Sequence, residues 1–157
     1  MSLRMDYQAA SPKGMKALGG LHHYVFQSGL PKSLIDLVFL RVSQINGCAY
    51  CVGKHVGDLL KDGIALEKIV LVATWREAEA LFDETERAAL AWAETVTRVA
   101  ETNVPDSDYR AAAASFDQKQ LADLTIAIGM MNAYNRMAIS FRVPPDAVRQ
   151  KQRELAA

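Results

Sequence analysis

The sequence lacks an excess of charge of either sign. Lys and Arg together number 18, Asp and Glu together also number 18, and the formal net charge at pH 7 is zero. A balanced chain has no basic field for a nucleic-acid backbone and no acidic tail for a cationic partner. We therefore do not expect nucleic acid as a partner.

Long apolar runs are also missing. The N-terminal stretch from Met1 to Tyr7 has no apolar core of signal-peptide length. The longest apolar stretch, Leu124 to Met131, is interrupted by Thr125 and is far too short to span a bilayer. The sequence therefore predicts a soluble, cytoplasmic protein without a membrane partner.

Cysteine is scarce, because Cys48 and Cys51 are the only two in 157 residues. Half of the chain is hydrophobic, so a domain of this length can bury a sizeable core without disulfide staples. A bridge between residues three apart closes too small a loop to stabilise a fold much. In a reducing cytosol such a pair is more often catalytic or metal-binding than structural.

Strand signals are scarce too, whereas helix start and stop signals recur along the chain. The sequence predicts one all-α domain over 1–157, with its core at about 12–142 and short N-terminal and C-terminal extensions. Pro144 and Pro145 end the folded part, and the charged tail from Arg149 to Ala157 is expected to be a frayed or weakly docked helix. The expected helices span about 12–28, 31–46, 48–61, 66–75, 84–102, 105–114 and 118–141.

Two long helices begin with capping-box patterns, Asp83 with Glu86 and Asp117 with Gln120. The second of them, Gln118 to Phe141, is apolar around most of its circumference. Such a helix is either central in the fold or covered by another subunit.

The chemistry is concentrated in Cys48-Ala49-Tyr50-Cys51, which His55 follows four residues later. Cys48 comes directly after an Asn46-Gly47 helix stop, where the unpaired amides of the next helix lower the pKa of a thiol. His55 lies one helical turn after Cys51 and can take its proton. Either sulfur could be the nucleophile; the histidine favours Cys51, and Cys48 would then close the disulfide.

The residues alone leave other uses of the thiol pair open. Zinc binding would need a fourth ligand, which only His22, His23 or Asp36 could supply. The pair could also be two inert buried thiols. One of the two adjacent histidines must face inward, either as a core-edge residue bonded to backbone or as part of a substrate pocket.

Three charged residues in apolar helices also require an explanation. Asp36 is a candidate to orient His55, because an antiparallel return through Asn46-Gly47 brings the two helices side by side; the alternative is a Ser33-x-x-Asp36 capping pair. Arg136 is expected to be buried and to bind a carboxylate, which can belong to another subunit. Arg41 raises the same question.

The run from Leu37 to His55 closely resembles the core of the carboxymuconolactone decarboxylase superfamily, in its alkylhydroperoxidase D-like (AhpD-like) branch. That branch is marked by Glu-x11-Cys-x-x-Cys-x-x-x-His. Ala73 to Arg76 and Asn132 to Arg136 also resemble the family, so the likeness covers roughly residues 20 to 142. It implies an all-α fold that assembles into trimers or hexamers, and a thiol peroxidase that reduces organic hydroperoxides with no cofactor and no metal.

Carried over by position, the resemblance makes Cys51 the peroxidatic cysteine, Cys48 the resolving cysteine and His55 the proton-transfer base. Asp36 takes the place of the family's glutamate. An aspartate is one methylene shorter, so a direct hydrogen bond to His55 can fail or need a water. The implied electron donor is a lipoyl- or thioredoxin-type dithiol.

Two further classes of function remain open. One is a redox-sensing or binding module whose thiol pair responds without turnover. The other is a carboxymuconolactone decarboxylase-type enzyme, although decarboxylase members are expected to lack the cysteine pair.

Overall fold

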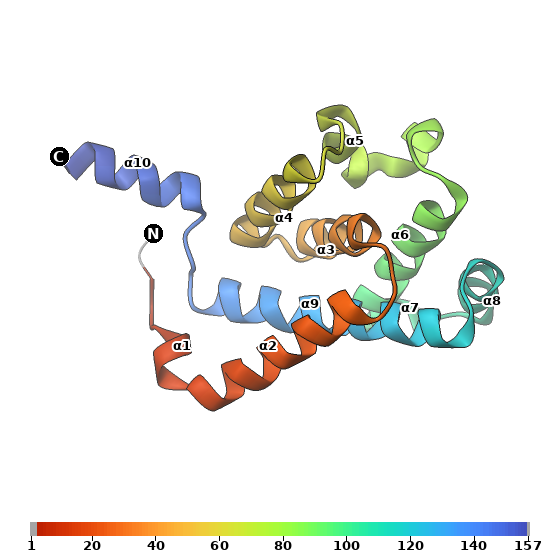
Figure 1. Ribbon diagram of the computed structural model, residues 1–157, viewed down its shortest axis with the longest axis horizontal. Coiled ribbons are helices and arrows are strands. Elements are labelled where there is room, and N and C mark those ends of the chain that lie inside the picture. Colours follow the sequence, from red (N-terminus) through yellow and green to blue (C-terminus); the bar gives the residue numbers. More distant parts are fainter. Residues whose placement is uncertain (1–2, 157) are drawn as a thin grey trace.

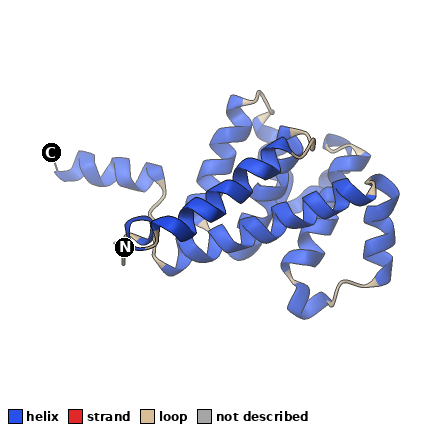
Figure 2. Cartoon of the chain, turned by 60° about the horizontal axis from the view of Figure 1, so that its bottom comes forward, coloured by secondary structure: helices blue, strands red, loops and turns tan. Residues whose placement is uncertain are grey.

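The computed structural model describes residues 3–156, and within that range every regular element is a helix (Figures 1 and 2). The predicted all-α class is confirmed. Residues 1, 2 and 157, the ends of the expected domain, lie outside the described part. The elements are α1 (Tyr7–Ala10), α2 (Pro12–Gln27), α3 (Lys32–Asn46), α4 (Ala49–Lys61), α5 (Leu66–Leu71), the 3-10 helix η1 (Val72–Leu81), α6 (Glu84–Thr97), α7 (Val99–Thr102), α8 (Asp106–Ser115), α9 (Gln118–Ser140) and α10 (Asp146–Ala156).

Local signals set most of the helix ends. Both predicted capping boxes form, with Asp83 starting α6 and Asp117 starting α9. Gly47 adopts a left-handed conformation, φ 70°, directly after α3. A side chain at that φ is costly, so glycine lets the chain turn at once into α4. The joint that carries the cysteines is therefore encoded locally.

Two predicted helices are broken in the structure. The expected helix over 66–75 ends as an α-helix at Leu71 and continues as η1, with non-helical backbone at Thr74 and Ala78. The expected helix over 84–102 stops at Thr97, and α7 follows separately. At this second break the Thr102 hydroxyl donates to the Thr95 carbonyl at 2.8 Å, a local bond that competes with continued helix.

The core is built around α3, which packs against α4, α6 and α9. Its fully buried side chains include Leu37, Phe39 and Leu40. The apolar helix α9 is central, as one of the two sequence interpretations proposed, because it also packs on α2, α6 and α8. Ile126 and Ile139 on α9 remain exposed.

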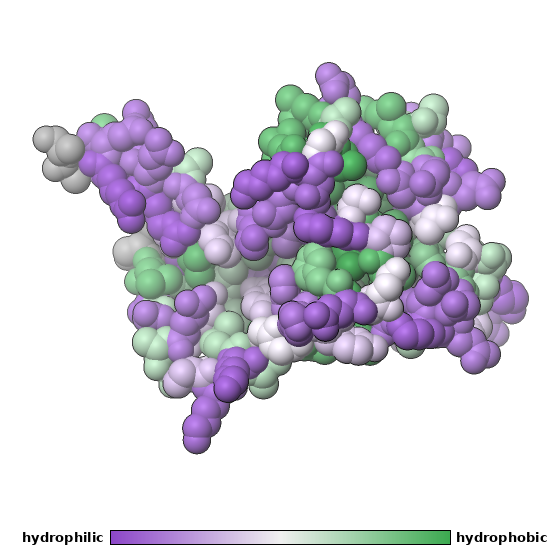
Figure 3. Space-filling view, in the orientation of Figure 1, coloured by the Kyte–Doolittle hydropathy of each residue, from purple (hydrophilic) through white to green (hydrophobic). Residues whose placement is uncertain are grey.

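The C-terminal helix α10 projects from the rest of the molecule at the left of Figure 1. It packs against α4, and the Arg149 guanidinium lies 5.7 Å from the centre of the Tyr50 ring. Its visible surface is mostly hydrophilic (Figure 3). These features match the expected weakly docked tail. Within residues 3–156 no helix combines the length and the apolar character that a membrane span needs.

Candidate active site

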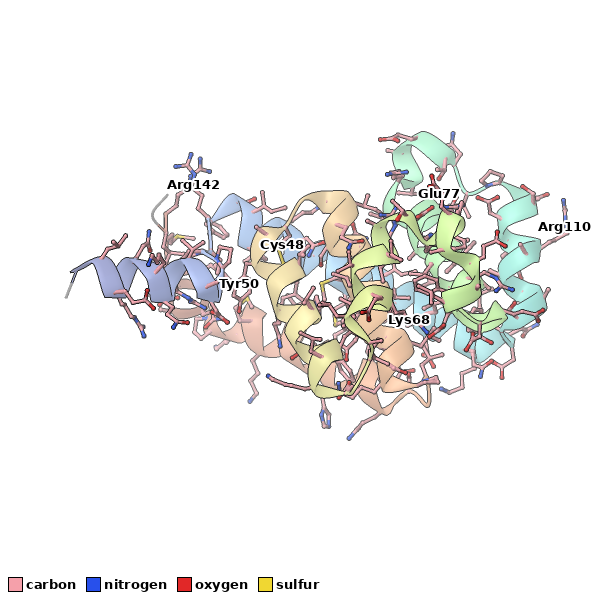
Figure 4. The ribbon with its side chains drawn as sticks, turned by 90° about the horizontal axis from the view of Figure 1, so that it is seen from above. Cys48, Tyr50, Lys68, Glu77, Arg110 and Arg142 are labelled. Carbon is pink, nitrogen blue, oxygen red and sulfur yellow. A yellow bond between two sulfur atoms is a disulfide. The ribbon has the colours of Figure 1, made fainter. Side chains whose placement is uncertain are left out.

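Cys48 and Cys51 form a disulfide at the start of α4 (Figure 4). Cys48 is the N-cap residue, and its sulfur accepts a hydrogen bond from the Cys51 amide at 3.3 Å. Both side chains are almost fully buried. The helix N-terminus therefore directs a backbone N–H at one sulfur of the pair, an arrangement that stabilises a thiolate there.

Cys51 opens onto a cavity of about 250 Å³ between α1, α2, α4 and α9. His55 lines the same cavity, as do aromatic and apolar side chains. The cavity is large enough for most of a small organic molecule to lie beside the Cys51 sulfur. The lining residues are Tyr7, Gln8, Gly19, His22, Tyr50, Cys51, Lys54, His55, Met131, Tyr134 and Ala138.

Cys48 lines a different cavity of about 420 Å³. Its walls come from the start of α4, the end of α9 and the segment 142–148 that leads into α10. Tyr50 and Ala138 line both cavities. The two sulfurs of one disulfide thus face two different spaces.

His55 is 4% exposed and packs against Phe39, with ring centres 5.3 Å apart. Burial lowers the pKa of His55 to about 4; the Asp58 charge opposes this shift, and the charges of Lys54 and His22 add to it. The imidazole is therefore neutral at pH 7 and able to accept a proton. Among the described residues its Nδ1 atom has no hydrogen-bond partner.

Asp36 lies beside His55 but does not hydrogen-bond to it. Its Oδ1 atom is 3.9 Å from His55 Nδ1, beyond hydrogen-bond length, which is one of the two outcomes that the shorter aspartate side chain left open. The alternative role as a capping residue is wrong, because Pro31 is the N-cap of α3 and Asp36 is 2% exposed within the helix. Lys32 donates to Asp36 Oδ2 at 2.8 Å.

Asp58 is a second carboxylate at the same histidine, and the sequence interpretation missed it. Its Oδ2 atom is also 3.9 Å from His55 Nδ1, and Lys54 donates to that oxygen at 2.9 Å. The signal was present, because residues three apart on a helix share a face. Ligand atoms of Asp36, His55 and Asp58 lie within 4.8 Å of one another and could hold a metal ion. Both carboxylates, however, already accept a hydrogen bond from a lysine: Asp36 from Lys32 and Asp58 from Lys54.

The two adjacent histidines have different surroundings. His22 is half-buried and lines the Cys51 cavity, in agreement with the pocket alternative. His23 is exposed. Neither His22 nor His23 belongs to the group of possible metal ligands found among residues 3–156.

The arginine predictions had opposite outcomes. Arg41 binds the buried Glu94 carboxylate, which also accepts bonds from Trp75 and Arg76. Arg136 is exposed, not buried, and donates to the backbone and side-chain oxygens of Asn132. The predicted burial was wrong because α9 turns Arg136 outward, whereas its neighbour Asn135 faces the core. The carboxylate of another subunit stays a prediction for Arg136.

The sequence is similar to that of known proteins. The model of the carboxymuconolactone decarboxylase family matches residues 12–95. The uncharacterized protein YdfG of Bacillus subtilis (strain 168) is 34% identical over 140 residues, which are 89% of this chain and 95% of that protein.

The fold is also similar to that of solved structures. A protein of unknown function from Agrobacterium tumefaciens, named as a candidate antioxidant defence protein AhpD, is 41% identical with a TM-score of 0.88 over 92% of this chain and 98% of its own. A debrominase is 17% identical with a TM-score of 0.78 over 92% and 77% of the two chains, a likeness of fold alone.

Proposed function

The chain belongs to the carboxymuconolactone decarboxylase family, and we propose that it is a thiol-dependent peroxidase that reduces organic hydroperoxides, cycling Cys48 and Cys51 between dithiol and disulfide. The observation that carries the proposal is the placement of Cys51 and a buried, neutral His55 on the wall of one cavity. The Agrobacterium tumefaciens relative adds support, because its name points to antioxidant defence.

In the oxidative half-reaction, His55 takes the proton of the Cys51 thiol. The thiolate attacks the terminal, hydroxyl-bearing oxygen of the peroxide, the O–O bond breaks, and the alkoxide takes the proton from His55 and leaves as an alcohol. Cys51 is then a sulfenic acid. Cys48 loses its proton and its thiolate attacks the Cys51 sulfur; the departing hydroxide takes up that proton and leaves as water, and the disulfide is complete.

In the reductive half-reaction, a lipoyl- or thioredoxin-type dithiol restores the pair. One donor thiolate attacks Cys51, the cysteine of the substrate cavity, and Cys48 leaves as a thiolate stabilised by the Cys51 amide. The second donor thiol attacks the sulfur of its own mixed disulfide and releases Cys51. The donor ends as a disulfide, so one peroxide consumes one dithiol.

The cavity favours an organic peroxide. Tyr7, Tyr50 and Tyr134 surround it together with Met131, and a hydrocarbon group gains from leaving water there. A peroxidase that depends on a dithiol donor fits the cytoplasm, where a dithiol state can be maintained.

We also retain the predicted homo-oligomer, a trimer or hexamer, for which the exposed Ile126 and Ile139 of α9 offer apolar contacts.

A steady-state assay tests this function. The protein is supplied with a panel of hydroperoxides and with dihydrolipoamide or reduced thioredoxin, and peroxide loss is compared with the loss caused by free dithiothreitol. We expect turnover that is faster with alkyl hydroperoxides than with hydrogen peroxide. Peroxide loss no faster than with dithiothreitol would favour a redox sensor, whereas lactone decarboxylation that survives loss of both cysteines would favour a decarboxylase.

A further inference from the structure

The Nδ1 atom of His55 faces two carboxylates at equal distance. Asp36 Oδ1 and Asp58 Oδ2 each lie 3.9 Å away, and within residues 3–156 this buried nitrogen has no hydrogen-bond partner. An unpartnered polar atom in the interior is costly, and a neutral imidazole that carries its hydrogen on Nδ1 leaves Nε2 free to accept a proton. One of the two carboxylates must therefore accept a hydrogen bond from Nδ1 when His55 becomes charged.

The two carboxylates differ in their surroundings. Asp36 is 2% exposed, and its other oxygen accepts a bond from Lys32, which also binds Asp62. Asp58 has 23% of its side chain exposed and belongs to the same helix as His55, one turn later. Its bond to Lys54 is at the surface, where such pairs contribute little and exchange readily with water. Asp58 is therefore freer to rotate and to close the 3.9 Å gap.

The pKa shifts of the two carboxyl groups also favour Asp58 over Asp36 as the partner of His55. Burial raises the pKa of Asp36, and Lys32 opposes this only in part. Burial also acts to raise the pKa of Asp58, but the hydrogen bond and the charge of Lys54, together with the charges of His55 and Lys61, lower it overall. Asp58 is also the largest charge that favours protonated His55. The charged and titratable groups that act on the ring or on its two carboxylates come from α2, α3, α4 and the C-cap of α4: His22, Lys32, Asp36, Lys54, Asp58, Lys61 and Asp62.

We propose that Asp58 is the positioning carboxylate of His55: it holds the ring and stabilises the imidazolium that forms when Cys51 loses its proton. This role is the one that position in the sequence would give to Asp36. The inference rests on the proposed peroxidase function, because it names the partner of the base in that same site. In chemical terms the proton moves from Cys51 to His55 Nε2, and Asp58 accepts a hydrogen bond from Nδ1 without being protonated.

The test measures the thiol directly, without any peroxide. In a Cys48→Ser background, where serine can cap α4, the rate of Cys51 alkylation by iodoacetamide is followed from pH 4 to 10. Asp58→Asn is compared with Asp36→Asn and with the matched control Asp62→Asn, which also removes a carboxylate paired with Lys32. If Asp58→Asn does not fold, Asp58→Ser provides the same comparison.

We expect Asp58→Asn to move the midpoint of alkylation upward by about one pH unit, the usual effect of losing an opposite charge at this range. Asp58→Glu should restore the original midpoint, which a merely structural role would not require. Asp36→Asn and Asp62→Asn should each move it by less than about a third of a unit. An equal or larger shift with Asp36→Asn, or no shift with Asp58→Asn, overturns the inference. Peroxide turnover of the unmodified protein is measured separately, so failure of the proposed function is recognised independently.

Discussion

The burial of His55 makes the stability of the oxidised protein sensitive to acid. The unfolded chain protonates this histidine near its ordinary pKa of 6.5, whereas burial lowers the pKa of the folded state to about 4. Between these two values the unfolded state binds more protons, so the free energy of unfolding falls as the pH falls. The stabilisation is fully present above pH 6.5 and is lost by pH 4.

The size of the effect follows from the two pKa values. The full difference corresponds to about 3 kcal/mol, since one pKa unit is worth about 1.4 kcal/mol. Between pH 7.5 and pH 5 the part attributable to His55 is about 2 kcal/mol. Asp36 contributes in the opposite direction because its pKa is raised, and His22 contributes in the same direction because its pKa is lowered.

Urea unfolding at both pH values isolates the part due to His55. The oxidised protein is compared with His55→Gln and with the control His23→Gln, whose histidine is exposed on α2. We expect the loss of stability between pH 7.5 and 5 to be about 2 kcal/mol smaller in His55→Gln and unchanged in His23→Gln. If His55→Gln loses as much stability as the original protein, the imidazole is not held neutral by burial and our account of the base is refuted.

Two further predictions concern the core. Glu94→Leu removes the carboxylate that binds Arg41, Trp75 and Arg76, so we expect thermal unfolding to show a loss of about 3 kcal/mol, and an unchanged melting temperature would contradict the role of this cluster. Leu40→Ala at a fully buried site should cost about 2–5 kcal/mol in urea unfolding. The control Leu60→Ala, at a half-exposed site, should cost less than about 1 kcal/mol. Equal losses of stability in Leu40→Ala and Leu60→Ala would contradict the position of Leu40 in the core.

What the sequence predicted well depends on neighbouring residues. The capping boxes at Asp83 and Asp117 and the left-handed Gly47 act within four residues of a helix end, so they are visible in the sequence. Gly47 places the cysteine pair at the start of α4. The break between α5 and η1 was not visible in the same way, because Trp75 and Arg76 bond to Glu94, almost twenty residues away, and that tertiary contact competes with regular helix.

The placement of the cysteine pair beside His55 was predictable from the sequence, whereas the surroundings of the carboxylates were less so. The distance between Cys51 and His55 along the helix put both on one face, and both line one cavity. The setting of Asp36 depends on how α3 packs beside α4, which spacing does not determine. Asp58 was missed because a surface acid beside Lys54 looks like an ordinary helical ion pair.

The central claim is that Cys51 is the sulfur that attacks the peroxide, and a single-turnover measurement tests it most directly. Reduced Cys48→Ser and Cys51→Ser variants are each mixed with one equivalent of cumene hydroperoxide, and the alcohol formed and any sulfenic acid trapped on the protein are quantified by mass spectrometry. Our account predicts about one alcohol per chain and a trapped sulfenic acid at Cys51 in the Cys48→Ser variant, with neither product in Cys51→Ser. A first turnover that survives in Cys51→Ser and disappears in Cys48→Ser would contradict it.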